Sequence, residues 1–304
     1  MWILLLAGCF GSGTDPDVSG KPPLKPGEKL SVLATTGMIA DAARIIGGED
    51  ADVTALMGPG VDPHLYQPTA QDQGKLKGAR LILYNGLHLE GRMVEIFENL
   101  AKRKHAVAVS SGIPEDRLLA WDAGGLHDPH IWFDVQLWRQ AVATTVDAFV
   151  KADPAREEKY RERARAYDAE LDSLDKYCRD RAAEVSEGQR VLITSHDAFH
   201  YFGRAYGFEV VGIQGISTDS EAGLKAITDA VDLIRSRKIR TIFPETSVPR
   251  AAIERVANDS GAALGEELYS DALGESDGPA GTYVGMIRSN IDQIVNGLRS
   301  SATE

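Results

Sequence analysis

Short apolar runs alternate with longer amphipathic stretches from Lys29 to the end of the chain. Runs rich in Val, Ile and Leu predict strands, and stretches with apolar residues three and four apart predict helices. In the first half the predicted strands are 30–34, 52–57, 80–84 and 105–109, and the helices lie near 39–46 and 135–151. In the second half the strands are 190–194, 209–213, 240–243 and 262–264, and the helices lie near 197–206, 221–237, 250–259 and 282–298. This alternation predicts an α/β fold of two lobes, each a mostly parallel four-stranded sheet with helices on both faces.

One long helix is predicted between the two halves, from about Pro154 to Val185. Asp153 suits the N-cap position and Pro154 suits the first helical position. About 32 residues at 1.5 Å each would span roughly 48 Å, enough to run along both lobes as a rigid strut. Its apolar residues form one stripe at steps of three and four: Tyr160, Ala164, Tyr167, Leu171, Leu174, Cys178, Ala182 and Val185.

The same stripe leaves a coiled-coil dimer open as an alternative. It covers only about four heptads and has small residues at several seam positions, so an intramolecular strut in a monomer is favoured. The expected organisation is therefore a leader and tether (1–28), an N-terminal α/β lobe (29–152), a linking helix (153–187) and a C-terminal α/β lobe (188–304).

The N-terminus has the features of a bacterial lipoprotein. Residues 2–7 form an apolar run of the secretory type, which is too short to span a bilayer because spanning takes about 20 apolar residues. Leu6-Ala7-Gly8-Cys9 matches a lipobox, in which the cysteine becomes the lipid-bearing N-terminus. The Gly-, Ser- and Pro-rich stretch that follows is typical of a flexible tether. These features predict an extracytoplasmic protein that is anchored to the membrane through Cys9.

Composition narrows the function classes. The formal net charge of -12 argues against nucleic acid as a partner, because phosphate binding needs concentrated Lys and Arg. Of the two cysteines, Cys9 and Cys178, only Cys178 lies in the folded part, so no internal disulfide is expected. The sequence also lacks the glycine-rich phosphate loop and the Gly-x-Ser-x-Gly elbow of common enzymes.

Three histidines and one aspartate stand in separate short polar motifs. Asp-Pro-His-Leu-Tyr-Gln-Pro contains His64, Asp-Pro-His-Ile-Trp-Phe-Asp contains His130, Ser-His-Asp-Ala-Phe contains His196, and Tyr-Ser-Asp-Ala-Leu contains Asp271. Imidazole nitrogen and carboxylate oxygen suit Zn²⁺, and they tolerate Mn²⁺. Each motif lies near the carboxyl end of a predicted strand or the start of a helix, where open parallel sheets place their ligands. The four residues predict a metal site between the lobes.

The remaining histidines are weaker candidates for metal ligands. His200 follows His196 by four residues, but a ligand set drawn from two lobes leaves it little access. His127 is better placed to line the pocket than to bind the metal, His88 reads as a rim residue, and His105 reads as part of a solvated loop. Glu245 ends a predicted strand, where it would either accept a hydrogen bond from a ligand imidazole or stand as a plain surface carboxylate.

A metal-dependent hydrolase is the alternative function. It would need an open coordination position and a nearby general base, and the sequence offers no convincing base. With all four positions filled by protein, carrying the metal is favoured over activating a water on it, so the chain is not expected to be an enzyme.

From Lys29 to Leu298 the chain resembles the substrate-binding lipoproteins of bacterial zinc and manganese ABC transporters, the TroA-like metal-binding proteins. The motifs around His64, His130 and His196 carry the resemblance, together with the segments 214–218 and 281–286.

The resemblance implies two four-stranded α/β lobes joined by one rigid helix. It also implies the metal ligands His64, His130, His196 and Asp271, and an ABC permease that receives the metal. Histidine at the third position is found in members that accept zinc or manganese. The stretch 119–126 lacks the histidine-rich loop of many zinc-specialised members, so Zn²⁺ or Mn²⁺ is the implied cargo.

Overall fold

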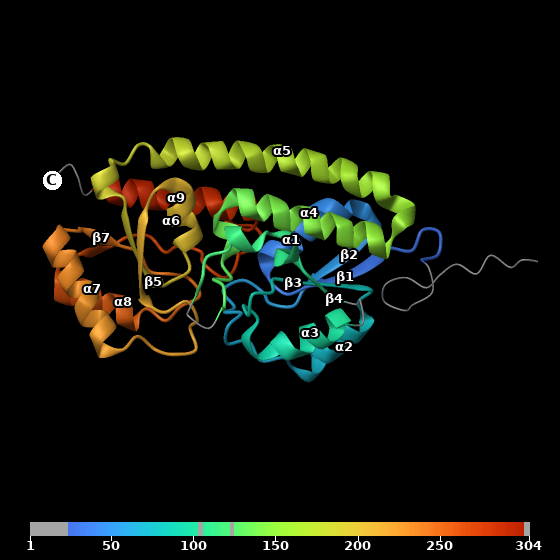
Figure 1. The fold of residues 1–304 in the computed structure, drawn as a ribbon, viewed down its shortest axis with the longest axis horizontal. Helices are drawn as coiled ribbons and strands as arrows, with labels where there is room; N and C mark the ends of the chain where they lie inside the picture. The colour runs from blue at the N-terminus through green and yellow to red at the C-terminus, as the bar shows by residue number, and fades with distance from the viewer. Residues whose placement is uncertain (1–23, 103–105, 122–124, 301–304) are drawn as a thin grey trace, which may run out of the picture.

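The structure is a computed structural model that describes residues 24–102, 106–121 and 125–300. Two α/β lobes lie end to end along the long axis, and one long helix runs over both of them (Figure 1). The predicted leader with Cys9, and also His105, lie outside the described residues. Within the described part of the chain, no helix combines the length and the apolar character needed to cross a membrane.

The sheet of the N-terminal lobe is parallel throughout, with the strand order β2-β1-β3-β4. Helices cover both faces (Figure 1). The strands are β1 (Leu30–Ala34), β2 (Ala51–Ala55), β3 (Leu81–Tyr84) and β4 (Ala106–Ala108). The helices are α1 (Gly37–Gly47) and α4 (Val135–Ala152) on one face, and α2 (Ala70–Gly78) and α3 (Val94–Lys102) on the other.

The sequence patterns did not predict α2 and α3. Helix α2 buries only Asp72 and Leu76, so almost no apolar stripe in its sequence indicates a helix. A capping box holds its first turn, in which the Thr69 side chain accepts from the Asp72 N–H and the Asp72 side chain accepts from the Thr69 N–H. Helix α3 buries Phe97 alone and has nine residues, fewer than the roughly ten to twelve over which an apolar period identifies a helix.

The C-terminal lobe repeats the plan with shorter strands. β5 (Val191–His196) pairs with β6 (Glu209–Gln214), and β7 (Thr241–Ile242) pairs with β8 (Ala263–Leu264), all in parallel. A parallel bridge between Thr194 and Phe243 connects the two pairs in the order β6-β5-β7-β8. Helices α6 (His200–Tyr206) and α9 (Tyr283–Ser300) lie toward the long helix, and α7 (Leu224–Arg237) and α8 (Ala251–Ser260) lie on the other side (Figure 1). The predicted α/β class is confirmed.

The boundary between β5 and α6 differs from the prediction. His196 is the last residue of β5, in register with Gln214, whereas the strand was expected to end at Thr194. The helix expected from Asp197 begins only at His200. The Asp197 carboxylate accepts from the Gly212 N–H at 2.6 Å, which ties this turn to β6 and delays the helix.

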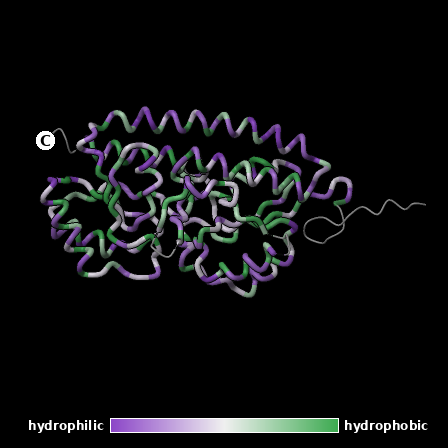
Figure 2. The backbone as a smooth tube through the Cα atoms, viewed as in Figure 1, coloured by the Kyte–Doolittle hydropathy of each residue, from purple (hydrophilic) through white to green (hydrophobic). Residues whose placement is uncertain are grey.

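The predicted strut is helix α5 (Glu157–Ala182), which follows a 3₁₀ turn at Pro154–Arg156. Asp153 precedes that turn, but its side chain makes no capping bond to the main chain; its Oδ2 accepts from the Tyr160 hydroxyl at 2.7 Å. Every residue of the predicted stripe is buried except Ala164, which is partly buried. Figure 2 shows α5 as mostly hydrophilic, with hydrophobic residues concentrated in the elements below it.

One hydrophobic core runs through both lobes on the strut side. It includes Trp138 from α4, Leu174 from α5, Tyr206 from α6 and Ile291 from α9. Two smaller cores lie under the opposite faces of the sheets, one in each lobe. Because the main core is continuous, rotating one lobe against the other would expose apolar surface.

The remaining short 3₁₀ turns of the described residues are η1 (Gly48–Asp50), η2 (Gly91–Met93), η3 (Val109–Gly112), η4 (Glu115–Arg117), η5 (Ile131–Phe133) and η7 (Glu187–Gln189).

Candidate metal centre

The fold brings His64, His130, His196 and Asp271 together between the lobes. His64 lies on the loop between β2 and α2, and His130 lies directly before η5 and α4. His196 ends β5, and Asp271 lies on the loop between β8 and α9. Each offers one ligand atom, all four atoms lie within 4.8 Å of one another, and no side chain is more than 2% exposed.

The polar atoms of this cluster converge on one another. Nε2 of His64 lies 3.3 Å from Nε2 of His130. The Asp271 carboxylate places Oδ1 3.4 Å from His130 Nε2 and Oδ2 3.3 Å from His196 Nε2. Among the residues that the structure describes, both Asp271 oxygens and His196 Nε2 are buried without a hydrogen-bond partner, which is costly unless something else satisfies them. Three imidazole nitrogens and a carboxylate around one point fit a divalent cation.

Two of the histidines are oriented in the same way. Asp128 Oδ1 lies 2.7 Å from His130 Nδ1 and also accepts from the His130 main-chain N–H at 3.0 Å. Glu245 Oε2 lies 2.5 Å from His196 Nδ1, and Glu245 Oε1 accepts from the His196 N–H at 2.8 Å. When the ring is neutral, a carboxylate on Nδ1 holds the proton there and directs the Nε2 lone pair toward the centre, as it does for metal-binding histidines in general.

His64 is oriented through its main chain. Its N–H donates to Asp62 Oδ1 at 2.8 Å. Behind it Gly91 has φ +38° and passes so close that a Cβ there would lie 2.4 Å from the His64 carbonyl oxygen. Asp62 in turn accepts from the Thr218 hydroxyl at 2.5 Å, and Thr218 belongs to the other lobe.

Buried hydrogen bonds join the lobes around the other three candidate ligands. The Trp132 indole N–H donates to the Ser270 carbonyl at 3.0 Å, which connects the neighbours of His130 and Asp271. The Tyr201 hydroxyl donates to the Asp128 carbonyl at 3.0 Å, and the Tyr283 hydroxyl donates to the Trp132 carbonyl at 2.8 Å. These bonds fix the relative positions of the candidate ligands from both lobes.

Electrostatics divide the three imidazoles into two groups. Burial alone would lower the pKa of His130, but the Asp128 and Asp271 carboxylates outweigh it and raise that pKa to about 9. Burial is likewise outweighed at His196, where Glu245 and Asp271 raise the pKa well above its usual range. Burial dominates at His64 and lowers its pKa to about 3. Without a metal, two rings are therefore protonated near neutrality and one is neutral.

The other singled-out histidines lie outside this cluster. His200 begins α6, and its ring nitrogens lie 3.6 Å from carboxylate oxygens of Asp128 and Asp197. His127 is partly buried and bridges to Ala120, and His88 is exposed with φ +64°.

Three supporting residues were not assigned a role from the sequence. Asp62 and Asp128 each precede a candidate ligand by two residues, and the repeated Asp-Pro-His motif was the signal that could have revealed them. Thr218 lies in the segment 214–218, which carries part of the family resemblance but contains no local signal of a role at the site. Nothing in the local sequence connects Thr218 to Asp62.

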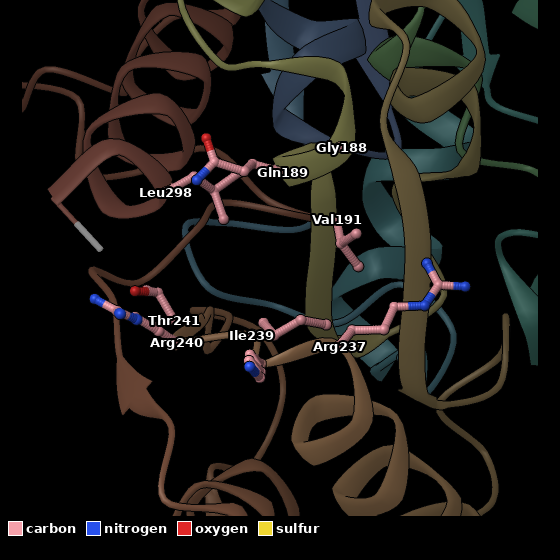
Figure 3. A pocket seen from close by; sticks show the side chains of 9 residues that line it. Gly188, Gln189, Val191, Arg237, Ile239, Arg240, Thr241 and Leu298 are labelled. Carbon is pink, nitrogen blue, oxygen red and sulfur yellow. The ribbon is translucent and has the colours of Figure 1, made fainter. Parts of the chain in front are cut away.

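A separate hollow of about 290 Å³ lies at the far end of the C-terminal lobe (Figure 3). Val191, Arg237 and Thr241 are among its lining residues. Val191 begins β5 and His196 ends it, so roughly 17 Å of strand separates this hollow from the histidine cluster. The hollow is therefore no part of the candidate centre.

The family model described as the periplasmic component A of the zinc-uptake complex matches residues 32–297. The chain belongs to this family. It is 44% identical over 304 residues to the manganese-binding lipoprotein MntA of Bacillus subtilis, covering 98% of both chains. It is also 44% identical over 294 residues to the zinc-binding protein TroA of Treponema pallidum, covering 95% of this chain and 92% of that one. The resemblance seen in the sequence is confirmed.

Solved structures agree with this assignment. The periplasmic zinc-binding protein TroA from Treponema pallidum superimposes with a TM-score of 0.86 at 45% identity, covering 89% of this chain and 99% of that one. The Mn-bound periplasmic metal-binding protein from Candidatus Liberibacter asiaticus superimposes with a TM-score of 0.80 at 29% identity, covering 89% and 100%. This fold is thus shared by a protein named for zinc and by one described as Mn-bound.

Proposed function

We propose that this chain captures one divalent transition metal, Zn²⁺ or Mn²⁺, between its lobes and delivers it to an ABC permease. The metal would be held by His64, His130, His196 and Asp271. One observation carries the proposal: four ligand atoms from four distant segments converge within 4.8 Å and are buried, and within the described part of the chain the Asp271 oxygens have no hydrogen-bond partner. Relatives named as zinc-binding, manganese-binding and iron ABC transporter substrate-binding proteins support a transported cargo.

Metal stoichiometry tests this assignment. Native mass spectrometry of the wild type should show one Zn²⁺ per chain. His130→Ala should weaken binding by at least about 100-fold, because losing a ligand costs more than losing its supporting carboxylate. His200→Ala is the comparison variant: its ring lies 3.6 Å from Asp128 but is not one of the four ligands, so binding should change little. Tight binding by His130→Ala would refute the ligand set.

The same geometry favours carriage over catalysis. Four protein side chains would supply the ligands, and the two Asp271 oxygens lie 3.4 Å and 3.3 Å from Nε2 of His130 and His196, so no carboxylate of that set would remain as a general base. The hydrolase alternative predicts metal-dependent turnover of phosphoester or peptide substrates. We expect none from the loaded protein, and turnover that follows the metal content would favour the alternative.

The membrane attachment rests on the lipobox at Cys9 and on the relatives named as lipoproteins. We expect the chain to divide into a leader and tether (1–28), two lobes (29–152 and 188–304) and a linking helix (153–187). We expect the mature protein to be extracytoplasmic, monomeric and lipid-modified at Cys9. Cys9→Ser should release the protein from membranes or block its maturation. Mass spectrometry that finds an unmodified Cys9 in mature, membrane-free protein would end this part of the proposal.

A further inference from the structure

The four candidate ligands are not held equally firmly. His130, His196 and Asp271 lie where buried hydrogen bonds join the lobes, through Trp132 to Ser270 and through Tyr201 to Asp128. His64 lies on a loop near the surface, and its neighbour Leu65 is 43% exposed. The other three have no exposed neighbour in sequence, so the loop of His64 lies nearest the surface, and it packs on the smaller core of its own lobe through Val61 and Tyr66.

Among the described residues, one side-chain hydrogen bond connects the His64 loop to the C-terminal lobe. The Thr218 hydroxyl donates to Asp62 Oδ2 at 2.5 Å, and Asp62 Oδ1 accepts from the His64 N–H at 2.8 Å. Thr218 is only 7% exposed, so this bond is shielded from water. A hydrogen bond to a charged acceptor in such a place is stronger than one between neutral groups.

The loop that carries Thr218 is itself fixed to the centre. Gln214 ends β6 directly opposite His196 in the strand register. Its side-chain amide donates to the Thr218 carbonyl at 3.0 Å and to the Ser220 carbonyl at 2.6 Å, which folds the loop back over the site. Contacts thus run from the strand end of His196 through Gln214, Thr218 and Asp62 to His64.

We infer that Thr218 is a positioning residue for metal binding, which locks His64 in its ligating position from the opposite lobe. Opening the contact between Thr218 and Asp62 frees the His64 loop while the other three ligands stay in place. The metal would then leave through the side of the centre that His64 closes. This inference rests on the proposed function, and it assigns the segment 214–218 a role in setting the rate of metal release.

Release kinetics test the inference. Full-length protein loaded with Zn²⁺ is mixed with excess chelator, and the release rate is followed for wild type, Thr218→Val, Thr218→Ser and Ser217→Ala. Thr218→Val keeps the shape but removes the hydroxyl, and it should release Zn²⁺ about tenfold faster with the stoichiometry unchanged. Thr218→Ser keeps a hydroxyl donor and should keep the slow release rate of the wild type. Ser217→Ala removes a neighbouring hydroxyl that contacts only Asp219 among the described residues, and it should match the wild type.

A double-mutant cycle separates a direct contact from a general loosening of the fold. In an Asp62→Ala background, Thr218→Val should add nothing further, because its acceptor is already gone. Additive effects, or a Thr218→Val rate within about twofold of the wild type, would overturn the inference. A wild type that binds no Zn²⁺ would instead refute the proposed function, so the two failures are distinguishable.

Discussion

His196 and Glu245 are 49 residues apart in the chain, and Nδ1 of the imidazole lies 2.5 Å from Oε2 of the carboxylate. Both side chains are buried. The same carboxylate also accepts from the His196 main-chain N–H, so it fixes both the ring and the strand end that carries it. Glu245 therefore controls which nitrogen of His196 faces the centre.

Removing that carboxylate should weaken the site without removing a ligand. Glu245→Ala should reduce Zn²⁺ affinity roughly 10- to 100-fold, the usual cost of losing a carboxylate that supports a metal-bound histidine. Isothermal titration with a competing chelator measures the change. Glu267→Ala is the matched control, because Glu267 is a partly exposed carboxylate of the same lobe that pairs with Arg250. Equal affinity in Glu245→Ala and the control would contradict the role of Glu245.

Metal binding should release protons. Near neutral pH the raised pKa values of His130 and His196 keep both rings protonated in the metal-free protein, whereas His64 is already neutral. A metal needs all three rings neutral, so about two protons should leave per ion at about pH 7. Calorimetry in buffers of different ionisation enthalpy counts these protons directly.

The sign of the pH dependence follows from the same shifts. A proton on a raised-pKa ring competes with the metal at every pH below that pKa, so affinity falls as pH falls. It should keep rising with pH up to about 9, the pKa of His130, instead of levelling off near the 6.5 of free imidazole. An affinity that is flat between about pH 7 and 8 would contradict the electrostatic division of the three histidines.

Metal choice should respond to the third ligand. Three nitrogens and one carboxylate should hold Zn²⁺ more tightly than Mn²⁺, which lies low in the Irving–Williams order and prefers oxygen. His196→Glu should lower the ratio of Zn²⁺ affinity to Mn²⁺ affinity by about tenfold, because it exchanges a nitrogen ligand for an oxygen ligand. The new carboxylate would face Glu245, so a companion variant His196→Glu/Glu245→Gln removes that repulsion. Competition titrations with both metals give this affinity ratio. A ratio that stays unchanged in both variants would refute the assignment of His196 as a ligand.

Loading should change the overall shape very little. Helix α5 packs along both lobes, and one core passes from Trp138 through Leu174 to Ile291. Wide hinge closure would break this core, so we expect a small tilt and local movement of the His64 loop. Scattering profiles of metal-free and Zn²⁺-loaded protein should superimpose, with His130→Ala as the non-binding control. A clear drop in radius of gyration on loading the wild type would contradict the rigid strut.

The sequence predicted those features that repeat locally. The strand runs, the buried stripe of α5 and the order of the two lobes all follow from the spacing of apolar residues, because burial on one face imposes a period of two or about 3.6. Where the period is weak the prediction failed. Helix α2 buries little beyond Leu76 and Asp72, so its capping box, and not its hydrophobicity, defines it.

The sequence also predicted which residues would come together as candidate ligands, because each stands in a short polar motif at the carboxyl end of a strand or the start of a helix, where a parallel α/β sheet places its ligands. The residues that hold these candidate ligands in position could not be predicted in this way. Thr218 and Asp62 are 156 residues apart, and only the packing of the lobes brings hydroxyl and carboxylate together.

The pKa of each histidine ring also depends on the tertiary structure. His64 and His130 occur in the same Asp-Pro-His motif, yet burial lowers the pKa of one while nearby carboxylates raise that of the other, because electrostatic energy depends on distances that only the tertiary structure sets.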